Sequence, residues 1–248
     1  MSYAIEVNQL SKSFRVGAFA QPKQVLFDLN FKVREGTTTG FVGANGSGKT
    51  TSLKCLLEFI FPEKGEIQFF GSELTRKSKE KIGYLPERPY FHEFLTGMEF
   101  LKFHWRLLGQ PDKFFQEKAL SALKKVDLTH AKDRFLRSYS KGMLQRIGLA
   151  QSILSDPRLL ILDEPMSGLD PDGRLMVKDI LREQQKNGIT LFFSSHLLQD
   201  MEELCEDLLI INKGHILYNA SMSGFMSKFP TLEQAYRQFR SDSERGES

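Results

Sequence analysis

Apolar residues occur in short blocks along the chain, and the spacing within these blocks changes from one region to the next. Between residues 24 and 33, Leu29, Phe31 and Val33 alternate with polar residues, as in a strand with one buried face. Residues 4–14 have the composition of a second strand. We therefore expect the chain to begin with an antiparallel, extended segment.

The next region changes from strand to helix across a group of glycines. The segment TTTGFVG, residues 37–43, is β-branched and apolar, and KTTSLKCLLEFI, residues 49–60, contains no helix breaker before Pro62. This order predicts a strand, a loop and a helix. GEIQFFG, residues 65–71, predicts a further antiparallel strand, and KIGYLP, residues 81–86, closes this part of the chain.

Residues 88–155 change to a helical pattern. Thr96 and Glu99 form a capping box that predicts a helix start. In the helix that follows, the apolar residues expected to share one face are Met98, Leu101, Trp105 and Leu108. We interpret this region as an inserted helical layer.

After Pro157 the apolar blocks lose their alternation. RLLILDEP (158–165), GITLFFSSH (188–196) and DLLIINKGHILY (207–218) are apolar almost throughout, which is typical of strands covered on both faces in a mostly parallel sheet. The fold class is therefore α/β, with a mostly parallel core sheet, an N-terminal antiparallel β subdomain and an inserted α-helical subdomain. The predicted divisions are 1–87 with 158–217, then 88–157, then a C-terminal helix and frayed tail over 218–248.

Composition narrows the class of protein without naming a function. The chain has 248 residues, 40% hydrophobic and 26% charged, with two cysteines and a net charge of +3. Two cysteines are too few for a disulfide framework, and no apolar run approaches the length of about 20 residues that a membrane span needs. The near-balanced charge does not indicate nucleic-acid binding. The N-terminus lacks the pattern of a signal peptide, so we expect a cytoplasmic protein.

The glycine-rich segment supplies the first candidate chemistry. Gly43, Gly48, Lys49 and Thr50 match the pattern G-x-x-x-x-G-K-[ST] of a phosphate-binding loop. Glycines allow successive main-chain N–H groups to surround a phosphate, and the N-terminus of the following helix adds positive potential. The alternative is a glycine-rich turn that only packs a helix against a sheet. The strand before the loop and the helix after it favour a nucleotide site.

A pair of carboxylates supplies the second set of candidate catalytic residues. Asp163 and Glu164 follow four apolar residues, and burying them is costly unless they are paired or coordinated. We expect them at the carboxyl end of a strand, the sheet edge where α/β proteins bind ligands, together with the glycine loop and His196. In this position Asp163 would hold magnesium and Glu164 would accept a proton from the attacking water. The carboxylates could instead cap the next helix, and His196 alone would be read as structural.

These residues, together with YSKGMLQR (139–146) and SGLD (167–170), resemble the ATP-binding subunits of ABC transporters, and the motifs occur in that family's order over residues 4–217. The resemblance implies ATP and Mg²⁺ as cofactors. It also implies a head-to-tail dimer, of two copies or with a similar subunit, in which the signature segment of one chain covers the nucleotide of the other. The residues it assigns to nucleotide binding are Phe14, Gly43, Ala44, Asn45, Gly46, Ser47, Gly48, Lys49, Thr50, Thr51, Ser140, Lys141, Gly142 and Met143. Lys49, Glu164 and His196 are assigned to catalysis, and Thr50, Asp163 and Glu87 to the metal.

The chain departs from the family pattern at three places. Lys141 and Met143 replace a glycine and a glutamine in the signature, which resembles a branch serving export-type transporters. Glu87 stands where the family usually has glutamine. Phe14 replaces the usual adenine-stacking tyrosine, keeping the aromatic face, and is alternatively a core residue.

Two further stretches bear on partners. Residues 88–105 contain six aromatic residues: Tyr90, Phe91, Phe94, Phe100, Phe103 and Trp105. We expect several of them to fill the core of the helical insertion and an exposed subset to form an apolar docking patch for a membrane partner. The basic run RKSKEK (76–81) is expected to be a solvated loop, with proximity to lipid headgroups as the alternative.

The function expected from the sequence is the ATP-hydrolysing subunit of an ABC transporter. It would work with separate polytopic membrane subunits on the inner face of the membrane, in the export direction. The alternative is a soluble ATPase of the same fold with a regulatory, assembly or DNA-maintenance role. A DNA-maintenance ATPase requires long heptad coils that the insertion lacks, and a small-molecule kinase would require an acceptor pocket that no motif indicates.

Overall fold

The computed structural model describes residues 2–15, 21–227 and 229–245, and the side chains up to residue 238. The chain forms two compact units, Met1–Leu74 with Ser194–Ser248, and Thr75–Phe193. The predicted subdomain boundaries at residues 87, 158 and 218 remain predictions.

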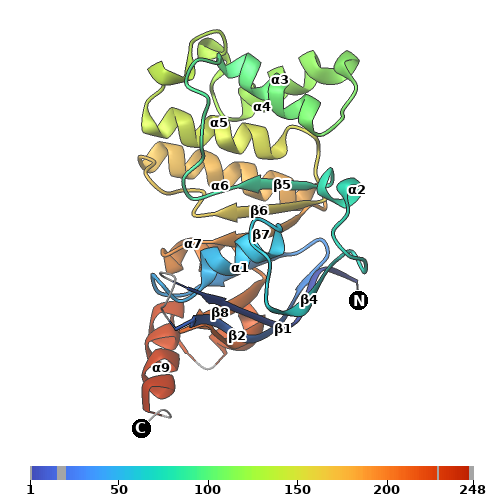
Figure 1. Ribbon diagram of the computed structural model, residues 1–248. Helices are drawn as coiled ribbons and strands as arrows, with labels where there is room; N and C mark the ends of the chain where they lie inside the picture. The colour runs from blue at the N-terminus through green and yellow to red at the C-terminus, as the bar shows by residue number, and fades with distance from the viewer. Residues whose placement is uncertain (1, 16–20, 228, 246–248) are drawn as a thin grey trace. The chain divides into compact units, whose positions relative to one another are not determined.

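The first unit contains the antiparallel sheet expected at the N-terminus (Figure 1). Strands β1 (Tyr3–Phe14), β2 (Lys23–Arg34) and β4 (Lys64–Phe69) are ordered β2-β1-β4. Val7 of β1 lies opposite Phe31 of β2 and Ile67 of β4. The alternating residues Leu29, Phe31 and Val33 are buried, so the predicted apolar face of β2 is confirmed.

The same unit contains the strand, loop and helix predicted around the glycines. Strand β3 (Thr38–Val42) pairs in parallel with β8 (Asp207–Asn212), with Phe41 opposite Leu209. The loop leads into α1 (Lys49–Leu56), and the unit is completed by β9 (His215–Ser221), α7 (Leu198–Leu204), α8 (Met222–Met226) and α9 (Leu232–Arg245). Helix α7 contacts β3 and α9.

Three sequence expectations in this unit need correction. DLLIINKGHILY is a hairpin rather than one buried strand, because β9 runs antiparallel to β8 and its side chains are partly or fully exposed. Helix α1 ends at Leu56, well before Pro62, because Glu58 adopts a left-handed conformation with φ 57°. The expected frayed tail is helical as far as Arg245, and residues 246–248 lie outside the described residues.

The second unit combines strands β5 (Ile82–Leu85), β6 (Leu159–Asp163) and β7 (Thr190–Ser194), in that order, with most of the helices. Gly83 of β5 lies opposite Leu160 of β6 in a parallel pair. The helices are α2 (Arg76–Lys79), α3 (Gly97–Leu107), α4 (Phe115–Lys125), α5 (Lys141–Ile153) and α6 (Pro171–Lys186), with short 3₁₀ turns at Asp112–Phe114, Thr129–Ala131 and Leu136–Ser138. The chain thus combines parallel strand pairs, antiparallel strand pairs and helices, which confirms the predicted α/β class.

Helices α3, α4 and α5 contact one another and form the expected helical layer. The capping box at Thr96 and Glu99 is present at the start of α3. The basic run, expected to be a loop, is instead largely the four-residue helix α2, which Thr75 and Ser78 cap reciprocally. No helix within the described ranges is long and apolar enough to cross a bilayer.

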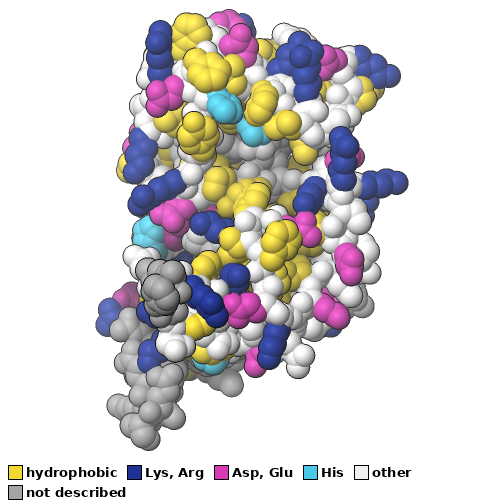
Figure 2. Space-filling model, viewed as in Figure 1, with side chains coloured by type: hydrophobic (Ala, Val, Ile, Leu, Met, Phe, Trp, Pro, Cys, Tyr) yellow, Lys and Arg dark blue, Asp and Glu magenta, His cyan; other side chains and the backbone are white. Residues whose placement is uncertain are grey.

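Of the six aromatic residues of 88–105, two are buried, three are exposed and one, Phe91, is half-buried. Phe100 and Trp105 are buried, each with 3% of its surface exposed, whereas Tyr90 is 84%, Phe94 71% and Phe103 40% exposed. The His92 ring lies within 5.6 Å of all three exposed rings. Figure 2 shows hydrophobic and histidine side chains side by side over the helices of this unit. We call Tyr90, His92, Phe94 and Phe103 the aromatic patch.

Candidate functional site

The glycine loop between β3 and α1 depends on glycine for two physical reasons. Gly46 and Gly48 have φ of 77° and 112°, a region that costs other residues energy. At Gly43 the reason is space, because an added Cβ atom would lie 2.4 Å from Ser47 Oγ and 2.5 Å from the Ile211 carbonyl oxygen. The main chain therefore lies close to its neighbours at Gly43 and adopts positive φ at Gly46 and Gly48.

Lys49 closes this loop with its side chain. Its ammonium donates a hydrogen bond to the Gly43 carbonyl at 2.6 Å and to the Ala44 carbonyl at 3.3 Å. The side chain is buried, with 8% of the residue exposed. A buried cation thus lies against two carbonyls of a loop at a helix N-terminus, where main-chain N–H groups and the helix dipole favour an anion.

The turn between β8 and β9 supports the loop from outside, and the sequence interpretation missed it. The Gly214 N–H donates to the Ser47 carbonyl at 2.8 Å, and the Gly214 carbonyl accepts from the Phe27 N–H at 2.9 Å. Gly214 therefore links the glycine loop to β2. Lys213 and Gly214 both have positive φ, as a two-residue hairpin turn of type I′ requires. The glycine between two apolar runs is the available signal in the sequence.

Other residues assigned to the nucleotide in this unit are more exposed. Asn45 lies exposed in the loop, and Thr50 and Thr51 are half-buried in the first turn of α1. Phe14 is the last residue of β1 and is 38% exposed, with Lys12 Nζ 5.4 Å from its ring centroid. Phe14 is therefore not a core residue. The loop that follows it lies partly outside the described residues.

The predicted carboxylates occupy the carboxyl end of β6 in the second unit. Asp163 is the last residue of the strand and is 1% exposed. Burial, and secondarily the charge of Asp163, raise the pKa of Tyr84 to about 12. Glu164 is half-buried and adopts a left-handed conformation with φ 53°. A buried acid is thus followed directly by a second acid on a strained main chain.

The signature segment forms the start of α5. Ser140 caps the helix, its hydroxyl accepting from the Met143 N–H at 3.2 Å. The helix begins at Lys141, so Gly142 lies within its first turn. Gln145 is buried and donates to the carbonyls of Pro165 at 3.1 Å and Glu164 at 3.4 Å.

The loop after the carboxylates packs against the same helix start. A Cβ atom added at Gly168 would lie 2.8 Å from Lys141 Cε, so the side chain of Lys141 lies along this glycine. Leu169 Cδ2 is 3.6 Å from the corresponding position at Gly142. Asp170 caps α6, accepting from the Gly173 N–H at 2.8 Å. The signature segment and SGLD are therefore neighbours within one chain.

Glu87 and His196 complete the predicted set. The Glu87 side chain is 46% exposed and lies 3.8 Å from Arg88 Nε. His196 is exposed, two residues beyond the end of β7. The convergence of the strand ends on one site, expected from the sequence, stays a prediction.

The proposed magnesium ligands are all hard oxygen donors, the type that Mg²⁺ prefers. Within the described part of the chain, no three His, Cys, Asp or Glu side chains are grouped to hold a metal ion. Such a donor set fits magnesium bound through one or two protein oxygens and the phosphates of a nucleotide.

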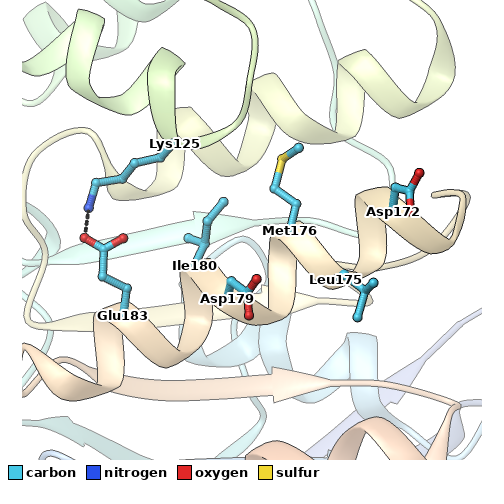
Figure 3. Close-up of a pocket in the computed structure, with 7 residues that line it drawn as sticks. All are labelled: Lys125, Asp172, Leu175, Met176, Asp179, Ile180 and Glu183. Atoms are coloured by element: carbon cyan, nitrogen blue, oxygen red, sulfur yellow. Dashed lines mark hydrogen bonds and ion pairs between the residues drawn. The ribbon is translucent and has the colours of Figure 1, made fainter.

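A separate groove runs along α6 in the second unit (Figure 3). It has a volume of about 460 Å³ and is lined by Lys125, Asp172, Leu175, Met176, Asp179, Ile180 and Glu183. Lys125 is paired with Glu183 at 2.6 Å. Because three acidic residues line this groove, its charge disfavours a phosphate ligand, and it does not supply a second nucleotide site.

Comparison with known proteins identifies the family. The family model described as "ABC transporter" matches residues 26–167. An uncharacterized ABC transporter ATP-binding protein of Synechocystis is 41% identical over 88% of this chain, which spans 63% of that protein. The bacitracin transport ATP-binding protein BcrA of Enterococcus faecalis is 36% identical over 90% of this chain, which spans 71% of BcrA.

Solved structures agree with this. The structure of an ATP-binding subunit of an ABC transporter is 27% identical and matches with a TM-score of 0.85, covering 96% of this chain and 99% of that one. An ATP-binding cassette solved as a dimer in a post-hydrolysis state, bound to ADP and Pi, has the same fold at 19% identity, with a TM-score of 0.78 over 88% of this chain and 98% of its own. With a glycine loop, a signature helix and a carboxylate pair in the family's order, the chain belongs to the ABC transporter family as one of its ATP-binding proteins.

Proposed function

We propose that this chain binds and hydrolyses ATP with Mg²⁺ and that hydrolysis moves a substrate through separate membrane subunits. The observation that carries the proposal is the glycine loop, in which the Lys49 ammonium is held 2.6 Å from the Gly43 carbonyl at the N-terminus of α1. A triphosphate supplies the negative charge that such a loop attracts. Family membership supports the coupling to transport.

The roles within the reaction follow from the chemistry of each side chain. Lys49 neutralises the β- and γ-phosphates, while Thr50 and Asp163 hold the magnesium ion with phosphate oxygens. Glu164 orients the attacking water and accepts its proton. His196 contacts the γ-phosphate. Bound magnesium supplies charge neutralisation of the leaving phosphates.

Other residues hold the nucleotide or link it to the partner. Phe14, at the exposed end of β1, offers an aromatic face for adenine. Glu87 follows β5 and is proposed to bind magnesium and to link its state to the membrane partner. Its carboxylate adds a negative charge that the usual glutamine lacks, so coupling is expected to differ more than binding.

The active form is proposed to be a head-to-tail dimer with a second copy or a similar subunit. Ser140 and Lys141 are exposed at the N-terminus of the 13-residue helix α5, where free N–H groups attract phosphate. A cassette of the same fold that was solved as a dimer supports dimer formation. Each signature segment would cover the nucleotide held by the other chain.

The membrane partner is proposed to bind the aromatic patch. Three exposed rings grouped around His92 form the kind of apolar surface that marks a protein contact. A polytopic membrane subunit docked there would hold this chain on the inner face of the membrane. Lys141 and Met143 in the signature support the export direction.

The first experiment tests the glycine loop. We expect Lys49→Ala to weaken ATP binding at least a hundredfold, because the loop loses the cation that faces the phosphates. Lys54→Ala is the matched control, since Lys54 is exposed on the same helix. Fluorescent-nucleotide titration measures both affinities, and an unchanged affinity in the Lys49 variant would overturn the assignment.

The second experiment tests the carboxylate and the dimer together. We expect Glu164→Gln to bind ATP and to remain a closed dimer with ATP and Mg²⁺, because the amide cannot accept the proton that hydrolysis releases. Glu117→Gln, an exposed site on α4, should behave like the wild type. Gel filtration that shows only a monomeric Glu164 variant with ATP and Mg²⁺ would count against the proposal.

A further inference from the structure

Gln145 makes an unusual connection between the signature helix and the main chain that carries Glu164. It is the fifth residue of α5, and only 7% of its surface is exposed. Its Nε2 lies 3.1 Å from the Pro165 carbonyl oxygen and 3.4 Å from the Glu164 carbonyl oxygen. One buried amide therefore donates to two successive carbonyls, directly at the residue proposed to orient water.

The main chain at Glu164 requires such support. Its φ of 53° is in the left-handed region, where a residue with a Cβ atom is disfavoured. Conformations of this kind persist only when surrounding contacts hold them. The Ser167 N–H also donates to the Glu164 carbonyl at 3.0 Å. The Glu164 carbonyl is thus held by its own loop and by α5, which restrains the main chain from which the carboxylate extends.

The contact between α5 and this loop extends beyond Gln145. Lys141 lies along Gly168, and Gly142 lies close to Leu169. These contacts are apolar or exposed, so Gln145 contributes the buried, directional link. A shift of the first turns of α5 would therefore be transmitted to the Glu164 main chain.

We propose that Gln145 is a positioning residue. It fixes the Glu164 main chain so that the Glu164 carboxylate is oriented for hydrolysis, and it links this main chain to the signature helix of the same chain. This inference rests on the proposed ATPase function for its catalytic consequence. Its structural part, the fixing of residues 164–167 by one side-chain amide, is independent of that function.

The test compares Gln145→Met with Gln184→Met. Methionine has nearly the shape of glutamine and lacks the donor, and Gln184 is a buried glutamine on α6 with the same 7% exposure. Amide hydrogen exchange over residues 164–170 and the ATPase parameters kcat and KM are measured for both variants, with ATP affinity determined separately.

We expect Gln145→Met to accelerate exchange at residues 164–170 and to lower kcat about tenfold, the effect of losing hydrogen bonds of ordinary strength. Its KM and ATP affinity should stay within twofold of the wild type. Gln184→Met should change neither exchange in this loop nor kcat. A role limited to packing would instead change KM and kcat together or leave both unchanged.

Unchanged exchange at residues 164–170, or an unchanged kcat, would overturn the inference. If Gln145→Met fails to fold, Gln145→Leu, which is close in size and has no donor, is measured in the same way and is expected to show the same two changes. A wild-type chain without ATPase activity would overturn the proposed function, while the exchange measurement would still decide whether Gln145 fixes the loop.

Discussion

Gly214 occupies a position where only glycine satisfies both the conformation and the available space. Its φ is 79°, and an added Cβ atom would lie 2.1 Å from the Val25 carbonyl oxygen and 2.8 Å from Phe27 Cδ2. Its N–H and carbonyl join Ser47 to Phe27. The shape of the glycine loop therefore depends on a residue far from it in sequence.

Replacing Gly214 by alanine should therefore lower both stability and ATP affinity. We expect a loss of about 3 kcal/mol in the free energy of unfolding, because backbone strain and a clash with main-chain atoms add together. ATP affinity should fall at least tenfold as Ser47 shifts. Urea unfolding and nucleotide titration measure the two effects.

Gly188→Ala is the matched control for this prediction. Gly188 has φ 78°, and a Cβ atom added there meets nothing within 4 Å. The Gly188→Ala variant should therefore lose only the part of the free energy of unfolding that comes from backbone strain, about 1–2 kcal/mol. Its ATP affinity should equal that of the wild type. Equal losses in the two variants would show that the close contact at Gly214 has no energetic effect.

Single residues also show what the sequence reveals and what it conceals. Gly43 to Lys49 form a contiguous motif, so their conformation was predictable from local sequence alone. Gly214 acts through Ser47, which is 167 positions away in the sequence. Gln145 acts through Glu164 and Pro165, which are 19 and 20 positions away. Contacts of this kind leave no periodic or local signal in one sequence.

Helix and strand ends were the least predictable features at the level of elements. Glu58 takes the left-handed position after α1, where glycine is usual, and the Phe59 N–H returns to the Lys54 carbonyl at 2.9 Å. The helix therefore stops without a glycine or proline to indicate it. By contrast, the capping box of α3 was predicted correctly because its two side chains act within four residues.

Helix α3 carries a half-buried histidine, His104, that should make stability depend on pH. Burial, and secondarily the charge of His92, lower the pKa of His104 to about 4. Between pH 6.5 and 4 the unfolded chain therefore binds a proton that the folded chain does not. Stability should fall as pH decreases through this window, by about 2 kcal/mol after allowance for partial exposure.

The variant His104→Gln should lose this part of the pH dependence, because glutamine does not titrate. The free energy of unfolding, measured by urea at pH 7 and pH 4.5, should fall by about 1.5 kcal/mol less in the variant than in the wild type. His130→Gln, at an exposed site, should retain the wild-type difference. An identical pH dependence in the His104 variant would contradict the assignment.

At the scale of the whole chain, the order of motifs was more informative than any single motif. A glycine loop alone is compatible with several classes of ATPase, whereas the succession of loop, signature, carboxylates and SGLD predicted the family that the comparison confirmed. The sequence did not reveal which aromatic residues of 88–105 are exposed. Core and surface aromatics look alike in a sequence, and tertiary packing separates Phe100 from Phe103.

The aromatic patch gives the prediction that decides between transport and a soluble role. We expect a triple variant, Tyr90→Ser with Phe94→Ser and Phe103→Ser, to bind ATP like the wild type while its recovery with membranes of the native cell falls at least tenfold. The reason is that exposed aromatic side chains provide most of the apolar area that a docking helix would cover. Membrane sedimentation and nucleotide titration measure the two properties.

The control is Leu175→Ser, which removes an apolar side chain that is 56% exposed on α6, a helix that contributes no residue to the aromatic patch. Its recovery with membranes should equal that of the wild type. If the triple variant also sediments normally, the patch is not the docking surface. If the wild-type chain is recovered without any polytopic membrane protein, the soluble regulatory or assembly ATPase becomes the better account, because hydrolysis would then have no channel-forming partner on which to act.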